Sequence, residues 1–232
     1  MDPVFDTQRF TDAREFIYKL SGLLSSLTAF LLEIVLACSS CWRLWEFNST
    51  AVQFVSFGLW DAYYHQEVNV SGSLNKILVN TPIDSTWTIP PEFQYAQNLI
   101  VWAILMKPIV LVFSTMAIKI SCMKHPLVEM QIYCQKMAAL VLFVSSLFTF
   151  SSVSVNYLDD LYGQSTLDFP ADFPVQKEDL KHKHLTAVFP VGLLIATMSL
   201  FGVIMFLSDI IYLKQESQVK AKCASKVASQ EA

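Results

Sequence analysis

The sequence predicts an α-helical membrane protein, a four-transmembrane-helix bundle with a small extracellular antiparallel β-sheet. Two observations predict this fold class. Four stretches of 19 to 27 residues are strongly apolar, and the segment between the first two is rich in aromatic and β-branched side chains. About 20 apolar residues in a helix cross the hydrocarbon core of a membrane, whereas aromatic and β-branched residues favour strands. The chain is 53% hydrophobic and only 16% charged, compared with about 25% charged residues in soluble domains.

We predict that the chain crosses the membrane four times, at residues 20–40, 98–118, 137–155 and 187–213. A buried core helix is the alternative for one such stretch, but four in a single chain favour membrane spans. The first stretch also resembles a secretory signal, because basic residues precede it and Cys38 ends a lipoprotein-like cleavage box. It is longer than the apolar region of a signal, about 7–15 residues. We therefore predict an uncleaved first span.

Lysine and arginine are unevenly distributed between the segments that connect the spans. With the N-terminus inside, ten of the 16 lie in the inner segments 1–19, 119–136 and 214–232, and five lie in the outer segments 41–97 and 156–186. Basic residues favour the cytoplasmic side. We therefore predict that both termini are cytoplasmic. The tail 214–232 is polar and has no large aromatic side chain, so we predict that it is disordered.

The first outer loop, 41–97, is too apolar to be disordered. Turns are expected at Asn48-Ser49 and at Ser71-Gly72-Ser73, between runs of strand-forming residues. These runs predict an antiparallel sheet of about three to five strands. The loop also carries two N-glycosylation acceptor patterns, at Asn48 and Asn69. Both support an extracellular position and delivery to the plasma membrane.

Two short motifs in this loop resemble a known family. Trp42 follows the first span, and Gly58-Leu59-Trp60 lies further along the same loop. In a four-span protein with both termini inside, this arrangement resembles the claudin family, whose members carry a tryptophan soon after the first span and then Gly-Leu-Trp. The resemblance implies that Trp42, Gly58, Leu59 and Trp60 anchor the sheet to the outer ends of the spans, since tryptophan favours the membrane interface.

The second outer loop, 156–186, supports this resemblance. Its stretch from Leu167 to Lys177 has two Phe-Pro pairs followed by Gln-Lys, which is similar to the second loop of claudins. The resemblance implies that Phe169 and Phe173 make trans contacts between cells. The alternative is a proline-bounded turn that packs its own aromatic rings.

The chain also departs from the claudin pattern. Claudins place a cysteine three residues after the tryptophan of Gly-Leu-Trp, where this chain has Tyr63. Gln97 stands where claudins have an arginine before the second span. The ending Ser229–Ala232 lacks the large apolar terminal residue that PDZ domains bind, which argues against a PDZ scaffold as a partner. The sequence therefore resembles a divergent branch of the family.

Charged and thiol groups in or near the spans give two further predictions. Glu33 and Lys107 lie at similar depths in the first and second spans, and charges inside a membrane usually pair. We predict that they form an intramembrane ion pair; the alternative is that each finds its own polar neighbours. Cys122 and Cys223 lie near the cytoplasmic ends of spans, where palmitoylation or a plain free thiol is expected.

The resemblance implies a membrane protein of tight junctions that forms an adhesive paracellular barrier, with itself or other claudins as partners in cis and in trans. The alternative is a non-junctional auxiliary or trafficking subunit related to peripheral myelin protein or calcium-channel gamma subunits. A membrane enzyme or transporter would rest only on Glu33 and Lys107. No catalytic pattern is recognisable, and His182 and His184 lack a nearby cysteine. We therefore predict no enzyme, no cofactor, no metal and no nucleic acid partner.

Overall fold

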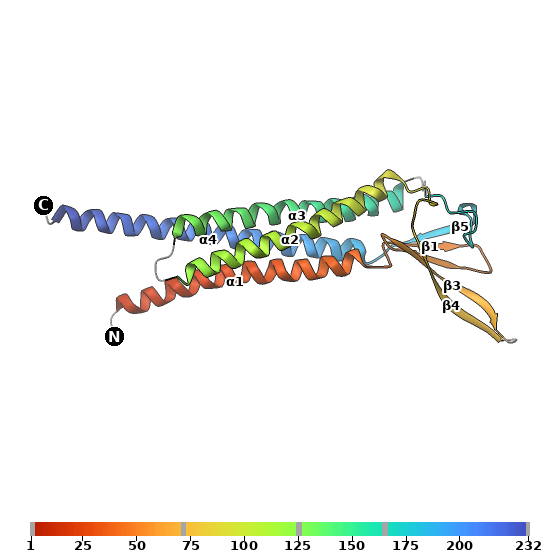
Figure 1. Ribbon diagram of the computed structural model, residues 1–232, viewed down its shortest axis with the longest axis horizontal. Helices are drawn as coiled ribbons and strands as arrows, with labels where there is room; N and C mark the ends of the chain where they lie inside the picture. The colour runs from red at the N-terminus through yellow and green to blue at the C-terminus, as the bar shows by residue number, and fades with distance from the viewer. Residues whose placement is uncertain (1–2, 71–72, 124–126, 164–166, 231–232) are drawn as a thin grey trace. The chain divides into compact units, whose positions relative to one another are not determined.

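The computed structural model describes residues 3–70, 73–123, 127–163 and 167–230 (Figure 1). Within these residues the chain forms four long helices, α1 (Pro3–Ala37), α2 (Pro91–Ser121), α3 (Val128–Tyr162) and α4 (Val188–Gln230). It also forms a short 3-10 helix, η1 (Lys177–Asp179), and the strands β1 (Arg43–Phe47), β2 (Phe54–Phe57), β3 (Asp61–Val70), β4 (Ser73–Pro82) and β5 (Leu180–His184). The predicted fold class, a four-helix bundle with a small antiparallel sheet, is confirmed.

Helices α2 and α3 extend beyond their predicted spans at both ends, whereas α1 extends only at its start and α4 only at its end. Pro91 opens α2, where its missing N–H costs no hydrogen bond, and Glu92 and Lys119 lie in the first and last turns, where their charges suit the helix dipole. Helix α4 continues to Gln230, so the prediction of disorder was wrong for residues 214–230. This segment is rich in Ala, Lys and Gln and contains neither Gly nor Pro, and such residues favour a helix.

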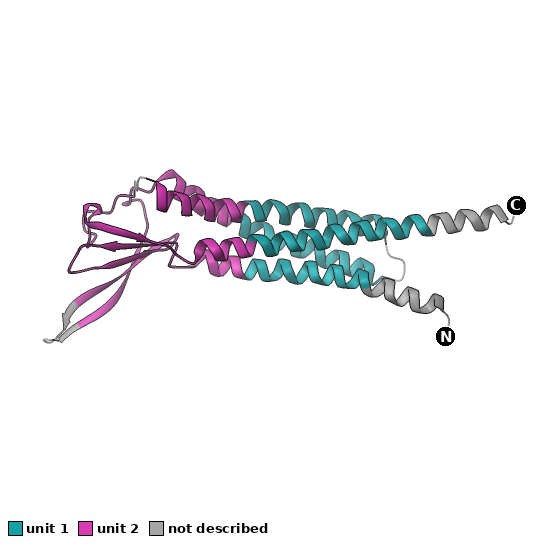
Figure 2. Ribbon diagram, turned by 180° about the vertical axis from the view of Figure 1, so that it is seen from behind, with its two compact units in different colours: residues 1–31, 103–147, 196–232 teal, residues 32–102, 148–195 magenta. Residues whose placement is uncertain are grey.

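The chain divides into two compact units (Figure 2). The helical unit consists of residues 1–31, 103–147 and 196–232, and the sheet unit of residues 32–102 and 148–195. Close packing in the helical unit depends on small residues. A Cβ atom at Gly22 would lie 2.4 Å from the ring of the buried Phe206, so glycine is needed for this helix contact.

The helical unit also exposes large apolar side chains on each of its helices. Leu24, Leu105, Leu140 and Ile204 are all more than half exposed. Large exposed apolar surfaces are rare on soluble monomers. In each helix the apolar stretch is long enough to cross a membrane. The chain is therefore a multi-pass membrane protein whose exposed helix faces suit contact with lipid.

The strands of the sheet unit form one antiparallel sheet in the order β4-β3-β2-β1-β5 among the described residues. Strands β3 and β4 pair from Asp61↔Pro82 to Val70↔Ser73, which confirms the hairpin predicted around residues 71–73. Strand β5 comes from the second predicted outer loop and pairs with β1. This strand was not identified from the sequence; its residues, Leu-Lys-His-Lys-His, are not the aromatic and β-branched residues typical of strands.

Candidate functional site

Trp42 connects the end of α1 to the start of the sheet. Its side chain is 1% exposed, and its indole Nε1 donates a hydrogen bond to the carbonyl oxygen of Leu36, at 2.9 Å. That carbonyl lies in the last turn of α1, where backbone acceptors have no partner within the helix. The hydrogen bond therefore fixes the orientation of the indole and also satisfies a carbonyl oxygen at the C-terminal end of α1.

Gly58, Leu59 and Trp60 form the connection between β2 and β3. A Cβ atom at Gly58 would lie 3.0 Å from the carbonyl oxygen of Ser39, so the connection packs closely against the chain that leaves α1. Leu59 is fully buried, and the side chain of Gln97 donates to its carbonyl oxygen at 2.5 Å. Trp60, in contrast, is 44% exposed. The four predicted anchor residues thus lie in the sheet unit, and their role at a membrane interface stays a prediction.

Phe169 and Phe173 lie in the aromatic core of the sheet unit. Phe173 is buried and Phe169 half-buried. The ring of Phe169 stacks on Phe57 with centroids 5.9 Å apart, and the ring of Phe173 meets Trp87 edge-on at 5.0 Å. Aromatic pairs at such distances stabilise a core beyond their buried area. These contacts correspond to the alternative of a turn that packs its own rings, while the predicted trans contact stays a prediction.

Arg43 carries a polar contact that sequence reasoning did not identify. Its side chain is 1% exposed, yet it is charged. The guanidinium donates to Asp159 at 2.8 Å and to Asn156 at 2.9 Å, and it lies 4.9 Å from the ring centroid of Phe93. A buried charge needs such partners to offset its lost hydration. The signal in the sequence was an arginine shortly after the first predicted span and two adjacent acids shortly after the third.

Asp160 extends this polar contact to the neighbouring part of β1 and to β5. The indole of Trp45 donates to its carboxylate at 2.8 Å, and the ammonium of Lys183 donates to its carbonyl oxygen at 2.6 Å. Burial lowers the pKa of Lys183, although the nearby Asp160 opposes this effect. Helix α3 therefore holds both β1 and β5 through adjacent acidic residues.

Glu46 connects β1 and β5 on the exposed side of the sheet. Its carboxylate accepts hydrogen bonds from Lys181, at 2.6 Å, and contacts Nε2 of His184 at 3.0 Å. The hydrogen bond from Lys181, and then that from His184, lower the pKa of Glu46. His182 and His184, which we considered as metal ligands, lie on this strand. The described residues contain no group of three or more His, Cys, Asp or Glu side chains placed to hold a metal ion.

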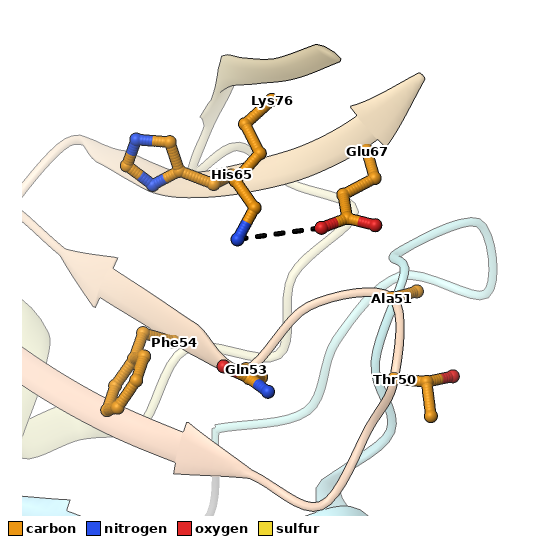
Figure 3. Close-up of a pocket in the computed structure, with 7 residues that line it drawn as sticks. All are labelled: Thr50, Ala51, Gln53, Phe54, His65, Glu67 and Lys76. Atoms are coloured by element: carbon orange, nitrogen blue, oxygen red, sulfur yellow. Dashed lines mark ion pairs between the residues drawn. The ribbon is translucent and has the colours of Figure 1, made fainter. Parts of the chain in front are cut away.

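An open pocket of about 310 Å³ lies beside the β3–β4 hairpin (Figure 3). Thr50, Ala51, Gln53, Phe54, His65, Glu67 and Lys76 line it. Glu67 and Lys76 face each other across the hairpin, with 3.5 Å between carboxylate and ammonium. All seven lining residues are exposed. The pocket is therefore part of a solvated polar surface.

Glu33 and Lys107 are both fully buried. The hydroxyl of Thr149 donates to the carboxylate of Glu33, and Nζ of Lys107 donates to the carbonyl oxygen of Ala29 at 3.5 Å. Each has further polar interactions beyond these. Both charges thus have polar surroundings within the apolar helices, and their mutual ion pair stays a prediction.

The helical unit contains a second buried polar cluster, which sequence reasoning missed. Its members come from α1, α2, α3 and α4 and are Glu15, Lys19, Ser121, Gln131, Gln135 and Asp209. Nζ of Lys19 lies 3.8 Å from Asp209, and both side chains are buried. The cluster cross-links the helices by hydrogen bonds in an apolar setting. Its signal in the sequence was a single acid, Asp209, within the fourth span.

The predicted modification sites are described in part. Asn48 is exposed, with its backbone N–H bonded to the carbonyl oxygen of Asp179 at 2.7 Å, and Cys122 is exposed at the end of α2. The side chains of Asn69 and Cys223 lie outside the part of the chain that the structure describes. Exposure of Asn48 and Cys122 is compatible with both modifications, which stay predictions.

No protein-family model matches the chain, and no curated protein matches it either. The arguments about function therefore rest on the residues and geometry given above.

Proposed function

We propose that this protein is a claudin-like membrane protein of cell–cell contacts, which adheres and seals by side-by-side polymerisation and head-on loop contact. Four apolar helices support a membrane location. The sheet joins strands from 41–97 to a strand from 156–186. Both segments are the ones proposed to lie outside the cell, with the termini in the cytoplasm. The proposed partners, in cis and in trans, are further copies of this chain or other claudins.

The β3–β4 hairpin is the observation that carries this proposal. Strand β3 pairs with β2 as far as Tyr64. From His65 to Val70, β3 pairs with β4. In this stretch Ile77 is 45% exposed and Leu78 58% exposed. Consecutive strand residues point to opposite faces, so both faces of the hairpin present apolar side chains. A hairpin that exposes an apolar side chain on each face of an otherwise polar surface suits contact with another protein surface.

The second loop contributes to the proposed contact through its shape. Phe169 and Phe173 pack in the core, whereas Asp168 and Asp172 beside them are exposed. We infer that the two rings hold the turn in place and that its exposed neighbours meet the opposing cell. The trans role of Phe169 and Phe173 is then indirect.

The experiment is expression of the tagged full-length chain in cells that lack tight junctions, followed by freeze-fracture imaging of the contacts. Continuous strands at contacts are expected. The double variant Ile77→Ser/Leu78→Ser should reach the surface but form few strands. Leu185→Ser is the matched control, because Leu185 is also an exposed leucine, at 69%, but lies between β5 and α4.

A diffuse surface signal without strands, in protein that is glycosylated at Asn48, would overturn the junctional role. The non-junctional auxiliary subunit would then be the better proposal, because a retained fold without polymerisation fits it. If the hairpin variant and the wild type formed equal numbers of freeze-fracture strands, the hairpin would not be part of the contact. Absence of the glycan at Asn48 together with cytoplasmic accessibility of the loop would overturn the proposed orientation.

A further inference from the structure

Two cysteines flank the short segment that leads from α1 into β1. Cys38 and Cys41 are separated by Ser39 and Ser40, and both are exposed and carry free thiols in the structure. The segment is folded rather than extended, because the chain bends at Ser40 and the backbone N–H of Cys41 donates to Oγ of Ser39 at 3.3 Å. Serine side chains commonly stabilise turns in this way. The fold of the segment brings its two ends toward each other.

The segment is fixed on the sheet by contacts on both sides of the bend. The hydroxyl of Ser56, in β2, donates to the carbonyl oxygen of Ser40 at 2.6 Å. Gly58 leaves room for the segment, since a Cβ atom there would lie 3.0 Å from the carbonyl oxygen of Ser39 and 3.4 Å from Cα of Ser40. The loop is therefore held in one place, with little freedom for its two cysteines to move apart.

Cys41 contacts a residue of the neighbouring strand β2, and Cys38 lies near the residue of β3 that is paired with it. Oγ of Ser56 is 3.4 Å from Sγ of Cys41. The cross-strand partner of Ser56 is Tyr63. Burial, then Asp61, raise the pKa of the Tyr63 phenol, and the nearby Cys38 contributes to the same shift. Directly opposed strand residues have Cβ atoms about 4.5–5.5 Å apart, so both cysteines lie near the same strand pair.

The geometry points to an intramolecular disulfide between Cys38 and Cys41 that closes the turn joining α1 to β1. Three residues span at most about 10 Å when extended, and the bend shortens this distance toward the range of Cα separations, below about 7 Å, that a disulfide allows. The hydrogen bond from Ser56 to the carbonyl oxygen of Ser40 involves neither thiol. It can therefore persist after oxidation.

The oxidant is a protein disulfide of the secretory route, which acts by thiol–disulfide exchange. One thiolate, at Cys38 or Cys41, attacks a sulfur of the donor disulfide and forms a mixed disulfide, releasing one donor thiolate. The other cysteine thiolate then attacks the mixed disulfide, forms the Cys38–Cys41 bond and releases the second donor thiolate. The two cysteines lose two protons and two electrons, and the donor gains both. The inference rests on the proposed orientation, which places this turn in an oxidising compartment.

The test counts thiols in the full-length chain made in cultured animal cells. Cys122, Cys134 and Cys223 are replaced by Ser, Ala and Ser, which leaves Cys38 and Cys41. Free thiols are blocked with N-ethylmaleimide at lysis, disulfides are then reduced, and the released thiols are counted by PEG-maleimide shifts on a gel. Two adducts on a monomer are expected. The variants with Cys38→Ser or Cys41→Ser should give none, because their remaining thiol is blocked at lysis.

The glycan at Asn48 reports the compartment in the same sample, since Asn48 follows Cys41 closely in the chain. No adduct in glycosylated protein would overturn the disulfide and leave the proposed orientation intact. No adduct, no glycan and a loop accessible from the cytoplasm would overturn both. A disulfide-linked dimer on a non-reducing gel would overturn the intramolecular bond. Mass spectrometry of the tryptic peptide 20–43 from the unsubstituted chain gives an independent count, with the oxidised peptide lighter by two hydrogen masses.

Discussion

The guanidinium of Arg43 lies 2.8 Å from the carboxylate of Asp159 and connects β1 to α3. Arg43 is almost fully buried, whereas Asp159 is 16% exposed. Removing one partner therefore has a different consequence from removing the other. Loss of Asp159 leaves a buried charge without its carboxylate, and loss of Arg43 leaves a carboxylate that water can reach.

We expect Asp159→Ala to lower the free energy of unfolding by about 3–5 kcal/mol, as for other buried pairs that lose one partner. Arg43→Ala should cost less, and the double variant should cost less than the sum of the two. Thermal unfolding in detergent micelles measures all three. Lys76→Ala is the control, because the Lys76–Glu67 pair is exposed and should be worth only about 0–1 kcal/mol. Equal losses at the buried and exposed pairs would contradict the argument.

Gly58→Ala should destabilise the sheet unit by about 1–3 kcal/mol, the cost of overpacking. The added Cβ atom would lie 3.0 Å from the Ser39 carbonyl oxygen and 3.3 Å from the Asp61 carbonyl oxygen. Both neighbours are backbone atoms, which cannot rotate away. A lower unfolding temperature and reduced surface delivery are expected. Ala51→Gly, at an exposed position in the same loop, is the control and should change neither measurement much.

The contact of Glu46 with Lys181 and His184 should make stability depend on pH. These hydrogen bonds lower the pKa of Glu46 from its ordinary value of 4.5. A lowered carboxyl pKa contributes stability that is present above the unfolded value and is lost as pH falls through the folded value. The unfolding temperature should therefore fall below about pH 4.5 in the wild type. In Glu46→Gln this part of the pH dependence should be absent, so the two curves should converge in acid; parallel curves would refute the role of Glu46.

Phe173→Ala separates core packing from cell contact. The ring is buried among Tyr64, Trp87 and Phe169, so its loss should cost about 3–5 kcal/mol. Phe173→Leu keeps most of the volume and should cost much less. Unfolding temperature and cell aggregation are measured together. Loss of aggregation at full stability in Phe173→Leu would indicate a direct contact by the ring, as the resemblance implies.

Glu33 and Lys107 give a prediction for the membrane spans. Each single substitution to Leu leaves the other charge buried, and both side chains are fully buried in the wild type. If they pair, the double substitution should reach the cell surface better than either single variant, because burying one charge without its partner costs more than burying none. Surface biotinylation measures this. Additive losses would favour separate polar neighbours for the two charges.

The sequence was most informative where structure depends on nearby residues. The four apolar stretches predicted the helices, because a spanning helix satisfies all its backbone hydrogen bonds within one segment. The β3–β4 hairpin was also predicted, from strand-forming residues around Ser71-Gly72-Ser73. The candidate sites Trp42 and Gly58 were found by resemblance, and the structure adds their contacts with Leu36 and Ser39.

The sequence by itself determined that this chain has four helices long and apolar enough to cross a membrane, together with a small sheet, since both follow from local runs of side chains. The tertiary structure decided the rest. Strand β5 exists because β1 offers hydrogen-bond partners to Leu180–His184, and Arg43 is paired because folding brings Asp159, 116 residues away, to its side. Phe169 and Phe173 lie in the core for the same reason. These contacts join residues far apart in the chain, and no local pattern encodes which distant partner a side chain will meet.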